Sequence, residues 1–328
     1  MTACSCTAGC RPRCSAESPP MRRSCGPTCI LPTSAWPTLS GLAMTPPPRL
    51  RDDTMSYRRR RLAGKRVIVT GASSGVGRAV ALELASRGAR VLATARRGDR
   101  LEELCRSAAP AAIEPLAGDI CEPAFRDRLV AAAVSRLGGL DALIAAAGGG
   151  AIGPFRDLTP DTFARIIDLD LTAPAELVRR SLPDLTRGDD PVIVFVGSIL
   201  GLHPLPLHGE YAAAKAALRS LAGTLRAELA SDGIGVLHVS LGPTESEFWE
   251  ALVTGERPPW SRGRRMPAAE AARRIADAME QRRTEITPGW QAVGYALAAR
   301  FLPWVIDAAA SRHLRAAARP GGMAGTNR

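Results

Sequence analysis

Short apolar runs alternate with amphipathic stretches between residues 66 and 241 of the 328-residue chain. The apolar runs predict strands near 67–69, 91–93, 114–116, 142–146, 192–196 and 236–239. The amphipathic stretches predict helices from about 76 and over about 98–108, 123–137, 160–182 and 210–231. Strands that are apolar throughout are typical of a parallel sheet with helices on both faces. The alternation therefore predicts an α/β fold, a doubly wound parallel sheet in a single domain of about residues 62–290.

A glycine-rich segment, TGASSGVG at 70–77, joins the first predicted strand to the first predicted helix. A tight turn of this kind lets backbone N–H groups and a helix N-terminus approach a pyrophosphate. Gly71, Gly75 and Gly77 are placed for that approach. Because the loop follows a strand and opens a helix, we expect a dinucleotide site at the carboxyl ends of the strands and not a purely structural turn.

The end of the second strand, ATARR at 93–97, bears on the choice of cofactor. An acidic residue there would hold the ribose hydroxyls and repel a 2′-phosphate. The segment instead has two arginines, and an arginine can bind that phosphate through charge-assisted hydrogen bonds. This favours NADP over NAD, with Arg96 as the candidate contact. Two solvated arginines are the alternative in this Arg-rich sequence.

Tyr211 and Lys215 lie four residues apart, on one face of the helix predicted over 210–231. A free tyrosine has a pKa of about 10. A fixed ammonium nearby stabilises the phenolate and lowers that pKa, so the phenol can serve as a general acid or base. Ser198 follows the strand before this helix, and its hydroxyl can orient the same substrate oxygen. The three residues predict chemistry on a carbonyl or an alcohol.

Five segments in this order, TGASSGVG (70–77), GDI (118–120), SILG (198–201), YAAAK (211–215) and LGPTES (241–246), together resemble the short-chain dehydrogenase/reductase family. The resemblance covers about residues 64–250 and implies a Rossmann-type oxidoreductase. In it, Tyr211 would be the general acid/base, Lys215 would hold the nicotinamide ribose and Ser198 would steady the reacting oxygen. Asp119 would contact the adenine, and Gly242, Thr244 and Ser246 would cover the nicotinamide carboxamide. The expected cofactor residues are Gly71, Ser73, Ser74, Gly75, Val76, Gly77, Arg96, Asp119, Ile120, Ala147, Gly148, Lys215, Gly242 and Thr244.

The chain departs from the family pattern at three places. Ala145-Ala146-Ala147-Gly148 stands where the family usually has Asn-Asn-Ala-Gly, and Leu241 stands where it usually has proline. Asp170 takes the helix position that often carries an Asn of the proton relay; an ionised Asp accepts hydrogen bonds but cannot donate them. Its charge should raise the pKa of Lys215 and partly offset the effect of Lys215 on Tyr211. A weakly active scaffold or sensor that binds NADP is therefore the alternative function.

Residues 1–61 differ in composition from the rest of the chain. They hold ten arginines against three carboxylates, a net charge of +7 out of +11, so the basic character does not indicate nucleic-acid binding by the domain. Six of the eight cysteines fall in the first 29 residues without zinc-site spacing, and no continuous apolar signal core is present. We expect a disordered extension, with Met55 as a natural alternative start. Only Cys105 and Cys121 remain in the domain, which suits a reducing cytoplasm.

Residues 246–266 correspond to the mobile substrate lid that the resemblance implies. Trp249 and Leu252 suit a partly hydrophobic carbonyl or alcohol substrate, whereas the run RGRR at 262–265 fits a solvated loop equally well. The candidates for the opposite wall are His203, Leu205, Leu207 and His208.

Residues 291–328 mix apolar side chains with arginines, and Pro303 interrupts the run. We expect an amphipathic helix and tail that packs on the domain or on a second subunit of a homo-oligomer. Peripheral contact of this helix with a membrane surface is the alternative.

Overall fold

The computed structural model describes residues 59–108, 112–250, 252–255 and 263–317. Their strands form one parallel sheet in the order β3-β2-β1-β4-β5-β6-β7. The strands are β1 (Arg66–Thr70), β2 (Arg90–Ala95), β3 (Ile113–Ala117), β4 (Ala142–Ala145), β5 (Val192–Ser198), β6 (Gly235–Leu241) and β7 (Glu285–Ile286). The strand order reverses between β1 and β4, which is where ligands bind in such sheets. The predicted α/β fold with a doubly wound parallel sheet is confirmed.

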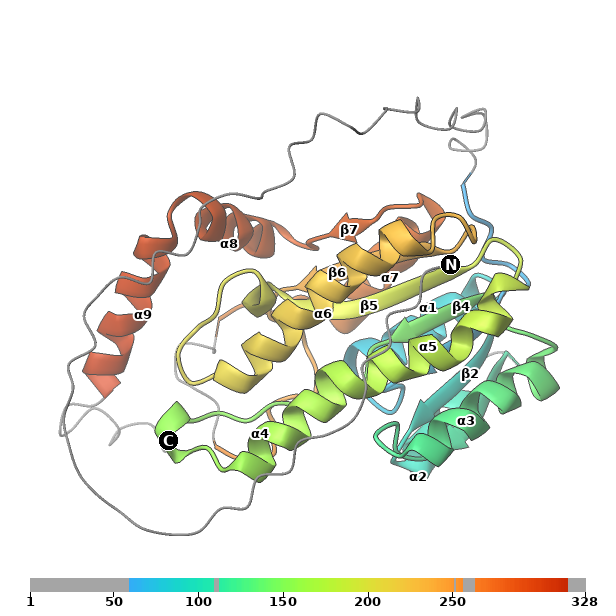
Figure 1. Ribbon diagram of the computed structural model, residues 1–328, viewed down its shortest axis with the longest axis horizontal. Helices are drawn as coiled ribbons and strands as arrows, with labels where there is room; N and C mark the ends of the chain where they lie inside the picture. Colours follow the sequence, from blue (N-terminus) through green and yellow to red (C-terminus); the bar gives the residue numbers. More distant parts are fainter. Residues whose placement is uncertain (1–58, 109–111, 251, 256–262, 318–328) are drawn as a thin grey trace, which may run out of the picture. The chain divides into compact units, whose positions relative to one another are not determined.

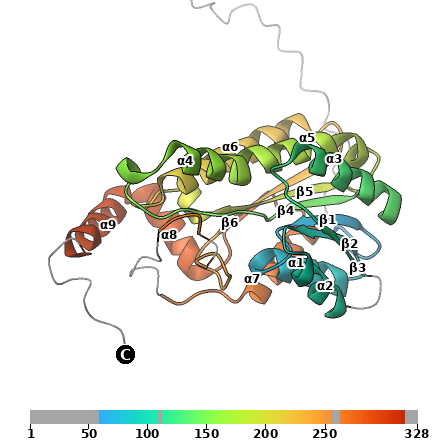
Figure 2. The same ribbon diagram turned by 90° about the horizontal axis from the view of Figure 1, so that it is seen from below.

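Helices cover both faces of this sheet (Figures 1 and 2). One face carries α1 (Gly75–Ser86), α2 (Gly98–Arg106) and α7 (Ala268–Glu280). The other carries α3 (Pro123–Ala132), α4 (Pro160–Ile167), α5 (Ala173–Thr186) and α6 (Gly209–Glu228). Successive strand residues point to opposite faces, so Val67 and Val69 enter the core under α1 while Ile68 enters the core under α3 and α5. This double burial explains why the central strands are apolar on both sides, whereas the edge strand β3 includes Glu114 and is partly exposed.

The helix predicted over 160–182 is one continuous rod with a change of pitch inside it. The π-helical turn η4 (Asp168–Thr172) separates α4 from α5. Such turns occur mostly at functional sites, and this one places Asp170 in the buried interior. The helix predicted over 123–137 likewise ends in a π-helical turn, η2 (Ala133–Leu137).

The C-terminal region differs from the single helix that we expected. Pro303 begins a second helix, so the region forms α8 (Trp290–Phe301) and α9 (Pro303–Ala317), because proline lacks the N–H that a continuous helix would need. Neither α7 nor β7 was predicted, since the buried side of α7 consists largely of alanines, which give a weak periodic signal.

The start of the domain lies slightly before the predicted boundary. Arg60, which we expected in the N-terminal extension, is buried and donates to the Met279 carbonyl at 2.9 Å. It also pairs with Asp190 at 3.2 Å. The predictions for residues 1–58, including the cysteine-rich segment and Met55, lie outside the described residues, as does that for Arg262.

Candidate active site

A cavity of about 540 Å³ lies beyond the carboxyl ends of the central strands. It is lined by each expected cofactor residue, namely Gly71, Ser73, Ser74, Gly75, Val76, Gly77, Arg96, Asp119, Ile120, Ala147, Gly148, Lys215, Gly242 and Thr244. Ser198 and Tyr211 line the same cavity. Asp170 is not in the lining but lies behind it, against Lys215 and Gly148.

The glycine loop between β1 and α1 has the shape of a close-approach turn. Gly71 has a φ of +68°, and a Cβ there would lie 2.7 Å from the Ala147 Cα. A Cβ on Gly77 would lie 2.3 Å from the Gly71 carbonyl oxygen. The first turn of α1 holds no acidic residue, and Ser74 makes no side-chain cap. The N–H groups of this turn therefore point into a cradle that a diphosphate fits.

Two arginines follow β2 and differ in their partners. Arg97 donates to the Glu247 carboxylate at 2.7 Å and to the Ser73 hydroxyl at 3.1 Å. Arg96 is exposed at the cavity edge. Within the described part of the chain, it has no carboxylate at ion-pair distance. Only one of the two guanidinium groups is thus committed to a protein carboxylate.

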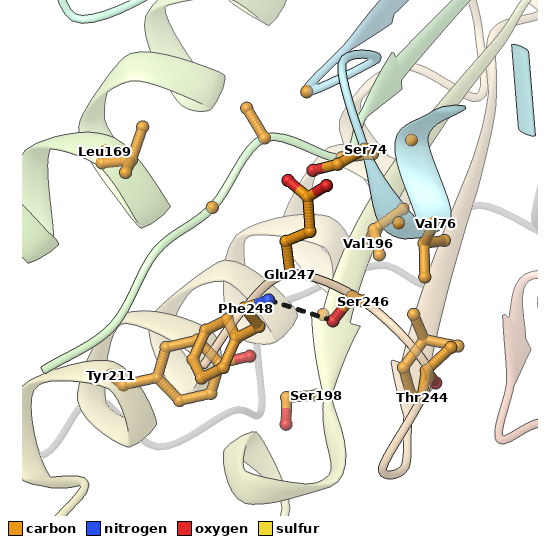
Figure 3. A pocket seen from close by; sticks show the side chains of 18 of the residues that line it. Ser74, Val76, Leu169, Val196, Ser198, Tyr211, Thr244, Ser246, Glu247 and Phe248 are labelled. Carbon is orange, nitrogen blue, oxygen red and sulfur yellow. Dashed lines mark hydrogen bonds between the residues drawn. The ribbon is translucent and has the colours of Figure 1, made fainter. Parts of the chain in front are cut away.

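Tyr211 lies in the first turn of α6, with its ring 5.4 Å from that of Phe248 (Figure 3). Ser198 ends β5, and its hydroxyl accepts from the Leu200 N–H at 3.1 Å. One turn further along α6, the Lys215 Nζ lies 5.5 Å from the centre of the Tyr211 ring. The structure brings these three side chains together, as the sequence pattern predicts.

Asp170 and Lys215 form a buried ion pair at 3.1 Å. The Asp170 Oδ1 also accepts from the Gly149 N–H at 3.2 Å, whereas its Oδ2 has no hydrogen-bond partner among the described residues. A Cβ on Gly148 would lie 2.6 Å from the Asp170 Oδ1, so this glycine is needed for the carboxylate to approach. Burial raises the pKa of Asp170 against the pull of Lys215. Burial lowers the pKa of Lys215, but Asp170 and Tyr211 outweigh this and raise it.

The pKa of Tyr211 is raised above its ordinary value. Burial is the largest cause and Asp170 adds to it, while Lys215 and the hydrogen bond with Ser198 act in the opposite direction. Lys215 lowers the pKa of Tyr211, as expected, but burial and Asp170 together raise it by more. In this geometry the phenol is held protonated at neutral pH.

The comparison with known proteins agrees with this site. A family profile described as short chain dehydrogenase matches residues 65–257, more than half of the chain. This chain belongs to the short-chain dehydrogenase/reductase family. It is accordingly an NAD(P)-dependent dehydrogenase or reductase. A short chain dehydrogenase of Pseudocercospora fijiensis is 38% identical over 194 residues, which span 57% of this chain and 62% of that protein's length. An uncharacterised oxidoreductase of Myxococcus xanthus is 32% identical over 265 residues, covering 80% of this chain and 99% of that protein.

Solved structures extend the likeness to three dimensions. A short-chain dehydrogenase from Streptomyces avermitilis has a TM-score of 0.67 at 28% identity and covers 76% of this chain and 96% of its own. A 3-ketoacyl-(acyl-carrier-protein) reductase from Brucella melitensis, complexed with NADH, has a TM-score of 0.64 at 25% identity, with coverage of 69% and 97%.

This short-chain dehydrogenase/reductase compensates in part for the missing amides at Ala145 and Ala146. The Thr70 hydroxyl accepts from the N–H groups of Ala146 and Ala147, each at 3.0 Å, and donates to the Ile144 carbonyl at 3.3 Å. One hydroxyl thus fixes the segment after β4 against β1. The residue motif alone gave no sign of this contact.

The expected walls of the substrate pocket are only partly right. Leu205, His208 and Trp249 line the cavity, whereas His203, Leu207 and Leu252 do not. His203 instead bonds the Asp307 carboxylate at 3.0 Å. Glu247 also lines the cavity, with its carboxylate pointing toward Ser74 (Figure 3), although no sequence motif marks it. Arg265, which the sequence leaves open between pocket and solvent, lines the cavity as well.

Proposed function

We propose that this enzyme transfers a hydride between NADP and a carbonyl or alcohol substrate, with Tyr211 as the general acid/base. One observation carries the proposal: the Tyr211, Ser198 and Lys215 side chains share a cavity with the glycine cradle. The cradle of Gly71 and Gly77 fits a dinucleotide, which supplies the hydride when bound.

Each residue then has a defined task. Ser198 and Tyr211, which line the same cavity, converge on the substrate oxygen and orient it. Tyr211 donates a proton to that oxygen during reduction and removes it during oxidation. A positioned acid of this kind contributes about 10²–10⁴ in rate. Lys215 holds the ribose and a positive charge next to the phenol.

Asp170 is proposed to position Lys215 and to bias the proton transfer. Its carboxylate holds the Lys215 Nζ at 3.1 Å and raises the pKa of Tyr211. A raised pKa keeps the phenol in its protonated form, which is the form that donates a proton to a carbonyl oxygen during reduction.

The preference for NADP over NAD rests on Arg96. Its neighbour Arg97 is occupied by Glu247, while Arg96 faces the cavity edge without an acidic partner in the described part of the chain. A 2′-phosphate would find a free guanidinium there.

The pocket supports a partly hydrophobic substrate, because Leu205, Phe248 and Trp249 line it beside Tyr211. Cys105 and Cys121 are free thiols, which supports a reducing, cytoplasmic setting. We also propose a homo-oligomer; the exposed Phe155, stacked edge-on with Phe163 at 6.5 Å, is a candidate contact.

The test is the oxidation of NADPH and of NADH against a panel of aldehydes and ketones of increasing apolar size. We expect turnover with NADPH and the lowest KM for apolar substrates. Arg96→Gln should raise the KM for NADPH by about 10- to 100-fold, because a charge-assisted hydrogen bond contributes about 1.5–3 kcal/mol, and should leave the KM for NADH nearly unchanged. Arg100→Gln, an exposed arginine on α2, is the matched control.

Two results would contradict the proposal. Equal efficiency with both cofactors, unaffected by Arg96→Gln, would remove the assignment of NADP. Tight NADPH binding without turnover of any carbonyl would favour the scaffold or sensor instead.

A further inference from the structure

Exposed apolar side chains gather on α8 and α9. Trp290, Phe301 and Trp304 are 77%, 61% and 62% exposed. The same two helices and their junction also expose Val293, Leu297, Leu302 and Val305. Within the described residues α8 buries one side chain, Ala292, and α9 buries none. Helices in proteins owe most of their stability to the packing of an apolar face. We therefore expect a partner to bind this exposed surface and bury its apolar side chains.

Basic groups border the apolar surface. Arg300, Arg312 and Arg315 are exposed. Among residues 290–315 the one acidic side chain is Asp307, and it is bonded to His203. The surface therefore combines large apolar side chains with an excess of positive charge.

The length and bend of α8 and α9 bear on how they could meet a membrane. No single helix in the described residues is both long and apolar enough to cross a bilayer; α8 and α9 pass that test only as a pair, which bends by 109°. A bent, basic pair of helices that exposes tryptophans and aliphatic side chains suits a segment that lies in the plane of a membrane surface.

We propose that α8 and α9 form a docking surface for an anionic lipid bilayer. Trp290 and Trp304 each stand at the start of a helix, and tryptophan prefers the boundary between headgroups and acyl chains. The three arginines match the negative potential of anionic headgroups. A twofold dimer would set this face against a copy of itself, and its one carboxylate, Asp307, is already bonded to His203. The three arginines would find no free acidic partner there, which disfavours a second subunit as the occupant.

The docking surface is joined to the catalytic domain by specific contacts. The Tyr295 hydroxyl donates to the His203 carbonyl at 2.9 Å, and the His203 ring bonds Asp307 at 3.0 Å. His203 belongs to the segment that carries Leu205 and His208 into the cavity wall. Both views place α8 and α9 on the side of the sheet away from α2 and α3 (Figures 1 and 2).

The test is co-sedimentation of the full chain with vesicles of phosphatidylcholine alone or with 30% phosphatidylglycerol. We expect binding to the anionic vesicles that weakens with salt. Leu297→Glu with Trp304→Glu should weaken it by at least about tenfold. Val134→Glu, a charge on an exposed apolar residue of η2, is the matched control and should change nothing.

A second variant keeps the proposal testable if the first variant fails to fold. Arg300→Gln with Arg312→Gln and Arg315→Gln keeps the apolar side chains and should abolish the preference for anionic vesicles. Melting temperature and light-scattering mass are measured for every variant. No binding to either vesicle, binding that ignores both sets of substitutions, or a dimer that Leu297→Glu with Trp304→Glu dissociates would overturn the proposal.

Discussion

Asp170 and Lys215 show how one substitution changes the electrostatics of the whole catalytic group. The family position usually carries a neutral amide, whereas here a carboxylate stands 3.1 Å from the Lys215 Nζ with no exposed surface. Low-dielectric surroundings strengthen its effect on neighbouring charges. The same carboxylate therefore holds the ammonium in place and raises the pKa of Tyr211.

Replacing Asp170 by Asn should lower the pKa of Tyr211, because it removes a negative charge that disfavours the phenolate. The amide oxygen of Asn still accepts from Lys215, so the geometry is kept. We expect the limb of the kcat/KM profile that reports Tyr211 to move to lower pH than in the wild type. Asp161→Asn, an exposed acid on α4, should leave the profile in place. A limb that stays or moves upward in Asp170→Asn would refute this role.

At the residue scale, the sequence predicted which residues form the candidate catalytic group. It did not predict which effect, burial or the Lys215 charge, would dominate the pKa of Tyr211. Tyr211 and Lys215 follow from a helical spacing, and Ser198 from the end of a strand. The dominance of burial over the Lys215 charge depends on the folded surroundings of Tyr211, and a linear pattern does not show it. The ion pair of Arg97 with Glu247 joins residues 150 positions apart and had no signal in the sequence.

The β1–α1 unit is the element whose shape constrains its sequence most tightly. Gly77 packs against the Gly71 carbonyl, so the loop and the first turn of the helix share one close contact. The loop could be predicted from its glycines because few other residues tolerate such contacts. No residue type marks the π-helical turn at Asp168–Thr172, so the sequence pattern predicted a regular α-helix across it.

Gly77→Ala should weaken NADPH binding by more than about 100-fold, since its Cβ would lie 2.3 Å from a backbone oxygen and force the cradle apart. Fluorescence titration of NADPH measures this. Gly223→Ala serves as the control because the structure has no atom within 4 Å of its Cβ and it lies inside α6. That variant should keep full affinity and gain about 0.5–1 kcal/mol of stability. Equal NADPH affinity in both variants would exclude the proposed role of the loop.

At the scale of the whole domain, the pattern of short apolar strands between helices was enough to predict the fold class. Double-sided burial makes the central strands largely apolar, and the run of short strands between helices was enough to predict six of the seven strands. The seventh strand has only two residues, Glu285 and Ile286, and carries no pattern. The C-terminal helices were expected to pack, and their exposed faces appeared only in the structure.

His238 in β6 links the stability of the domain to pH. Burial lowers the pKa of His238 to about 4, and its Nε2 has no hydrogen-bond partner among the described residues. An unfolded histidine takes up a proton below about 6.5, whereas the folded one does so only near 4. The stability that the neutral, buried His238 gives the folded state is thus complete above pH 6.5 and is lost as the pH falls toward 4.

We expect this histidine to account for about 3 kcal/mol of the loss in unfolding free energy across that window. Urea unfolding between pH 7.5 and 4.5 measures the loss. His238→Leu should flatten the slope, whatever its effect on stability at pH 7.5. An unchanged slope would show that other groups cause the acid sensitivity.

The central claim is that Tyr211 exchanges the proton while the cofactor site works independently of it. Single-turnover oxidation of NADPH by the wild type and by Tyr211→Phe, with the NADPH dissociation constant measured in parallel, tests this most directly. We predict a rate lower by about 10²–10⁴, loss of the pH-dependent limb and a dissociation constant within about twofold of the wild type. A Tyr211→Phe enzyme that turns over at the wild-type rate, with the same pH dependence, would contradict the account.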